Sequence, residues 1–168
     1  MNKFLMMSIL LCLSCSGLSQ DKEDIVLSVL SKDVIGKTFK FNLSDKKDYN
    51  NEASITYLGE IDTKTKGKYY VVTWGRVWGP NNHTTGAVLL YDNKKQYFGK
   101  YVLGAISDLP IKLDKNELFF YNTSRNDCDQ SLVTKIDFSE IPKNIFIKCN
   151  GELGDVYELN LDSSDRKF

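Results

Sequence analysis

From Lys37 to Leu161, apolar residues tend to occupy every second position, and this period of two is the feature that most limits the fold. Phe39, Phe41 and Leu43, for example, alternate with polar residues. Because successive side chains of a β-strand point to opposite faces of a sheet, the alternation predicts half-buried strands. The segment 68–78 carries apolar residues at both parities, which predicts a central strand that is covered on both faces.

Short polar segments separate these alternating runs. The segment 79–85 is predicted to be a loop, and the four residues 92–95 are predicted to form a hairpin turn. We expect strands at 37–43, 55–61, 68–78, 87–91, 96–103, 110–113, 117–122, 131–138, 143–149 and 155–161. About nine or ten short strands at this spacing predict a mainly β fold, either an antiparallel β-sandwich or a small barrel.

One segment before the strands has the period of a helix. Within 21–35, the apolar residues Val26, Val29 and Leu30 recur at helical spacing, and acidic residues crowd the first turn. Gly36 is a plausible stop. We therefore expect a single N-terminal α-helix that packs over one end or face of the sheet.

The first 19 residues resemble a bacterial secretory signal peptide. Lys3 supplies a positive charge, 4–13 is an almost unbroken apolar run, and Gly17 and Ser19 are small residues two positions apart. The run is shorter than the ~20 residues that cross a bilayer, so we expect no transmembrane segment. Cleavage after Ser19 would leave 20–168 as a single β-rich domain that is secreted or periplasmic.

A second processing route starts at Cys15. This residue follows Leu13-Ser14, which resembles a bacterial lipobox, although Cys12 stands where that motif usually has leucine. The alternative prediction is therefore a lipoprotein that is lipidated on Cys15 and anchored in the cell envelope.

Removal of the first 19 residues leaves two cysteines, Cys128 and Cys149. Two cysteines in an exported chain predict a disulfide bond, with two reduced, buried thiols as the alternative. They are too few for a structural zinc site, and the only histidine is distant in sequence. We predict no metal and no cofactor.

Charge and motifs exclude several classes of function. The chain has 22 basic and 22 acidic residues, and its basic residues are scattered, so nothing predicts nucleic-acid binding. No sequence motif of a nucleophile or of a zinc protease is present. His83 is the only histidine, and we expect it in a solvated loop. These observations favour a non-enzymatic protein.

The only grouping of residues that suggests a ligand lies on the segment 68–78. Tyr70, Trp74, Arg76 and Trp78 fall on one face of that predicted strand, and His83 follows in the next loop. Such an aromatic row could stack a sugar ring while the arginine binds a hydroxyl or carboxylate. The alternative is that the row belongs to the hydrophobic core.

The main expectation is thus an exported, non-enzymatic protein that binds a protein partner or a glycan. One alternative is a secreted hydrolase with paired carboxylates, for which Asp127, Asp129, Glu152 and Asp155 lie near the two cysteines. The same acids could also bind Ca²⁺, although solvated loop acids are the simpler interpretation. Another alternative is a structural protein of the cell envelope.

Overall fold

We analysed a computed structural model of the chain, which describes residues 20–45, 49–122 and 125–161. The predicted signal peptide and Cys15 lie outside these residues. Within them, ten strands, one α-helix and one short 3-10 helix are present. Their bounds are α1 Gln20–Lys32, β1 Thr38–Asn42, β2 Asn51–Thr63, β3 Gly67–Trp78, β4 His83–Asp92, β5 Tyr97–Leu103, η1 Ile106–Asp108, β6 Lys112–Asp114, β7 Glu117–Tyr121, β8 Val133–Asp137, β9 Asn144–Asn150 and β10 Leu153–Asn160.

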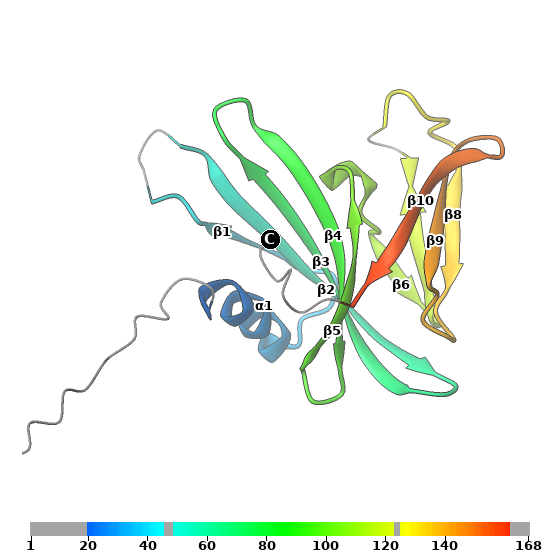
Figure 1. Ribbon diagram of the computed structural model, residues 1–168, viewed down its shortest axis with the longest axis horizontal. Helices are drawn as coiled ribbons and strands as arrows, with labels where there is room; N and C mark the ends of the chain where they lie inside the picture. Colours follow the sequence, from blue (N-terminus) through cyan, green and yellow to red (C-terminus); the bar gives the residue numbers. More distant parts are fainter. Residues whose placement is uncertain (1–19, 46–48, 123–124, 162–168) are drawn as a thin grey trace, which may run out of the picture.

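The strands form two antiparallel sheets. The large sheet has seven strands in the order β1-β2-β3-β4-β5-β10-β9, and the small sheet has three in the order β6-β7-β8. The described strands form no closed barrel, so the mainly β prediction is confirmed and the arrangement is consistent with a β-sandwich (Figure 1). β10 pairs with β5 only through Leu159 and Asn160, and the hairpin of β9 and β10 diverges from the large sheet toward β8.

The helix covers one face of the large sheet, as its period predicts. Val26, Val29 and Leu30 of α1 are buried against inward-facing residues of β2, β3 and β4. The helix ends at Lys32, earlier than the predicted Ile35, because the backbone turns into the left-handed region at the next residue.

The second hydrophobic core lies on the opposite face of the large sheet. Residues such as Val71, Leu90 and Tyr101 of the large sheet pack with Leu118 and Phe120 of the small sheet. β3 therefore has a core on each side, which confirms the prediction of a central strand. No helix among the described residues is long and apolar enough to cross a membrane.

The disulfide predicted between Cys128 and Cys149 is present, and it joins the segment after β7 to β9. Beside it, the buried side chain of Asn122 contacts both of these segments. Its Nδ2 atom donates toward the carbonyl oxygens of Asp129, Lys148 and Cys149, at 3.1, 3.0 and 3.3 Å. A covalent bond and a buried amide thus hold the same loop in place.

We expect the Cys128→Ser, Cys149→Ser double variant to lose about 3 kcal/mol of unfolding free energy, because the bond closes a loop of 21 residues in the unfolded chain. Urea unfolding followed by circular dichroism measures the change. Reduction of the wild-type protein should produce the same shift in midpoint, and a midpoint insensitive to reductant would contradict the prediction.

Candidate functional site

The predicted ligand row lies on the face of β3 that is directed toward α1. Alternation along β3 places Tyr70, Trp74, Arg76 and Trp78 on this face. The register with β4 is unbroken along this stretch, whereas the register with β2 shifts between Tyr70 and Trp74. The sequence therefore assigned these four residues correctly to one face. The structure divides them between the interior and the surface.

Trp74 belongs to the core, whereas Trp78 does not. Trp74 is 1% exposed and packs in the cluster that α1 covers, while Trp78 at the end of the strand is 38% exposed. Tyr70 is half-buried, with its ring centroid 6.0 Å from that of Tyr57. Arg76, between the two tryptophans, donates from Nε to Oδ1 of Asn51 at 2.9 Å.

His83 lies on a strand and not in a loop. The predicted loop 79–85 is shorter than expected, because β4 already begins at His83, which pairs in register with Trp78. The two rings lie 5.1 Å apart, and His83 is exposed. A turn at 79–82, with positive φ at Gly79 and Asn82, joins the two strands. The end of this hairpin thus brings Trp78 and His83 together.

A pocket of about 350 Å³ opens beside this row. It lies on the face of the large sheet that carries Trp74, beyond the part of the row that is buried in the core. Its walls come from three neighbouring strands: Arg76 and Trp78 of β3, Thr84 and Thr85 of β4, and Lys100 and Val102 of β5. One exposed indole and several polar side chains therefore surround a single hollow.

Sequence analysis did not identify Lys100 as part of this site. Its side chain is buried, with 3% exposure, yet it lines the pocket from β5. A lysine is rarely buried this completely. The pairing of Lys100 with Leu89 across β4 and β5 places its side chain on the face that carries the pocket. This pairing joins two strands, so no pattern within the segment 96–103 indicates it.

The acids near the cysteines do not converge on one point. Asp129 accepts hydrogen bonds from the amide and the hydroxyl of Ser131, which lower the pKa of its carboxyl. Glu152 pairs with Lys148. The two sulfur atoms beside Asp127 are joined in the disulfide, and so they are not thiolate ligands for a metal.

Asp155 instead belongs to an ion triad that sequence analysis missed. Arg125 contacts Oδ1 of Asp108 with Nε at 3.4 Å and Oδ2 of Asp155 with Nη2 at 3.0 Å. Burial lowers the pKa of the Arg125 guanidinium, but its hydrogen bond to Asp155 and the negative charge of Asp108 outweigh burial and raise that pKa. The guanidinium links η1, the disulfide loop and β10, so the triad has an evident structural role.

Comparisons of the chain with protein-family models, with curated proteins and with solved structures found no match. The geometry of the described residues is therefore the basis for any functional conclusion.

Proposed function

We propose that this chain is an exported, non-enzymatic protein that binds a carbohydrate at the pocket beside Trp78. The observation that supports the proposal is the exposed indole of Trp78 in the wall of a hollow that also carries hydroxyl and cationic side chains. Binding sites of this size usually combine apolar surface with a few polar groups that orient the ligand.

The chemistry of the walls is suited to a sugar ring. A pyranose ring has a face of C–H groups, which can lie on the indole, and a rim of hydroxyl groups. Thr85, which pairs with Arg76 on the same face of the sheet, can donate and accept a hydrogen bond at that rim. His83 packs against Trp78 and limits the positions that its ring can take.

Export is supported by two features of the chain. The leader-like composition of residues 1–19 is typical of secretory signal peptides. The disulfide is a bond that persists mainly in oxidising compartments. The intact mass of the exported protein tests this part of the proposal. A mass equal to that of residues 20–168 supports cleavage after Ser19, whereas a diacylglycerol adduct on Cys15 supports the lipid-anchored alternative.

We expect the mature protein to bind one class of glycan on an array, and the same free sugar to change its tryptophan fluorescence. The chain has two tryptophans, and Trp74 is buried, so the change should arise from Trp78. Trp78→Ala should lower the affinity at least about tenfold, because the stacking surface is lost.

Phe146→Ala is the matched control. Phe146 is an aromatic residue on β9 with a nearly equal exposure of 39%, and it does not line the pocket. Binding that survives in Trp78→Ala, or that is lost equally in Phe146→Ala, would contradict the proposed site. Capture of a protein partner without any glycan binding would favour the protein-binding alternative instead.

A further inference from the structure

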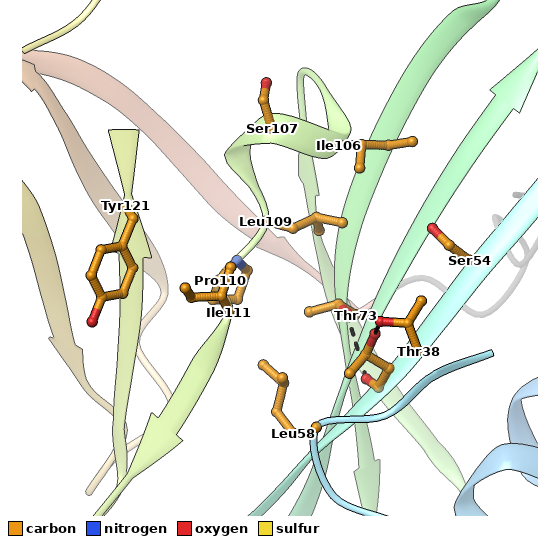
Figure 2. Close-up of a pocket in the computed structure, with 12 residues that line it drawn as sticks. Thr38, Ser54, Leu58, Thr73, Ile106, Ser107, Leu109, Pro110, Ile111 and Tyr121 are labelled. Carbon is orange, nitrogen blue, oxygen red and sulfur yellow. Dashed lines mark hydrogen bonds between the residues drawn. The ribbon is translucent and has the colours of Figure 1, made fainter. Parts of the chain in front are cut away.

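A second cleft of about 350 Å³ lies on the opposite face of the large sheet from Trp78. Consecutive residues of β3 point to opposite faces of the sheet, so Thr73 lines this cleft and Trp74 lines the pocket beside Trp78. Its other wall is the segment 106–111, which contains η1 and leads into β6. Figure 2 shows Ile106 and Leu109 extending from this segment toward the strands that carry Ser54, Thr38 and Thr73.

The wall formed by the sheet carries a row of hydroxyl groups. Thr38, Thr56 and Thr73 are register neighbours on β1, β2 and β3. The hydroxyls of Thr38 and Thr56 are hydrogen-bonded at 2.8 Å, and Thr73 donates to the carbonyl oxygen of Thr56 at 3.5 Å. Since each hydroxyl has one proton and two lone pairs, this wall retains capacity mainly to accept hydrogen bonds.

The facing wall is mainly aliphatic, although Ser107 and Tyr121 also line the cleft, and glycines bring this wall close to the sheet. Gly75 and Gly86 are paired across β3 and β4. A Cβ atom at Gly75 would lie 3.1 Å from Cγ1 of Ile106, and one at Gly86 would lie 2.6 Å from the carbonyl oxygen of Ala105. Two residues without side chains thus allow η1 to pack on the sheet beside the cleft, and they keep its two walls at their observed separation.

Alternation along β2 places a further aliphatic side chain in the cleft. Leu58 follows Thr56 by two residues, so it points to the same face and lines the hollow, next to the point where the register of β2 and β3 shifts. Ile111 also lines the cleft and is largely exposed, as is Ile35, which adjoins the lining residue Gly36. Apolar surface therefore extends from the interior of the cleft to its rim.

The described residues that line the cleft include no charged side chain. A ligand that carried a formal charge would lose its hydration on entry and would gain no ion pair, so the cleft is selective against ions. A ligand that donates hydrogen bonds on one side and has an aliphatic surface on the other matches both walls.

From these features we infer that the cleft is a second binding site, for a neutral amphiphile whose short aliphatic chain carries a hydroxyl or amide group. The aliphatic chain lies against Ile106, Leu109 and Leu58, and the polar group donates to the threonine row. This inference concerns a site separate from the carbohydrate pocket, and it stands whether or not Trp78 binds a sugar.

The experiment compares hexanamide with hexanoate, which have the same chain length but differ in charge at pH 7. Each is titrated into the ¹⁵N-labelled mature protein, and amide chemical shifts are followed. We expect hexanamide to shift the resonances of Thr56, Thr73 and Ile106. Hexanoate should bind at least roughly tenfold more weakly than hexanamide. Equal affinity for the two compounds, or shifts confined to the surroundings of Trp78, would overturn the inference.

The Thr56→Val, Thr73→Val double variant tests the hydroxyl wall, since valine keeps the shape of threonine and removes its oxygen. We expect hexanamide affinity to fall about fivefold or more, with the thermal unfolding curve confirming that the variant is folded. Thr65→Val is the matched control, because Thr65 lies in an exposed turn outside both hollows. An equal loss of affinity in Thr65→Val, or no loss in the double variant, would refute the role of the threonine row.

Discussion

Replacement of Trp74 with alanine is expected to lower the free energy of unfolding by about 3–5 kcal/mol. Trp74 lies between Ile55 and Ala87 in the register of the large sheet, and its side chain is 1% exposed. Truncation would remove its contacts with the core under α1 and leave a cavity that the paired strands cannot readily close. The same change at Trp78, which is exposed, should cost less than about 1 kcal/mol.

Urea unfolding followed by far-ultraviolet circular dichroism compares the two variants without depending on either indole. A loss of several kcal/mol in Trp74→Ala beside a small change in Trp78→Ala would confirm that the aromatic row is divided between core and surface. Equal stability of the two variants would contradict this division, and it would also remove the structural reason for assigning the ligand to Trp78 alone.

The second large effect is expected at Asn122. In the Asn122→Asp variant, a carboxylate would replace the amide that now donates toward three carbonyl oxygens, and the position is only 2% exposed. A buried charge that faces only acceptors costs about 3–5 kcal/mol. Protonation removes that charge. The loss of unfolding free energy relative to the wild-type protein should therefore grow as pH rises above the usual pKa of an aspartate, and it should shrink in acid.

Asn122→Ala separates the loss of the donor from the effect of the charge. This variant should lose about 1–3 kcal/mol, because buried carbonyl oxygens lose a partner but no charge is introduced. Denaturant unfolding at pH 4 and at pH 7 measures both variants. An Asn122→Asp deficit that is the same at the two pH values would show that the carboxylate is solvated, and hence that the loop beside the disulfide is open to water.

Much of the fold could be predicted from consecutive residues. The alternation around Phe39 and Phe41, the helical spacing of Val26, Val29 and Leu30, and the turn at 92–95 led to a mainly β chain with one helix. These patterns are local, because the direction of a side chain follows from the backbone of its own element. Errors occurred at element ends, as at His83, where pairing with Trp78 extends β4 into a polar segment.

The candidate sites were less predictable, because they depend on which elements cover each face. Trp74 and Trp78 have the same residue type and the same parity, and only the extent of the packing around α1 separates core from surface. The sequence around Gly75 does not indicate that η1 packs against this glycine, since Ile106 is distant along the chain. Likewise, no local pattern around Lys100 places it in a pocket.

The order of residues alone therefore determined the strands, the helix, the shared face of the aromatic row and the pairing of Cys128 with Cys149. Tertiary structure decided which part of that row reaches solvent, and it created both hollows, one beside Trp78 and one between the threonine row and η1. The physical reason is that periodicity specifies the direction of a side chain relative to its own strand. The surface opposite that side chain is supplied by segments that are distant in sequence.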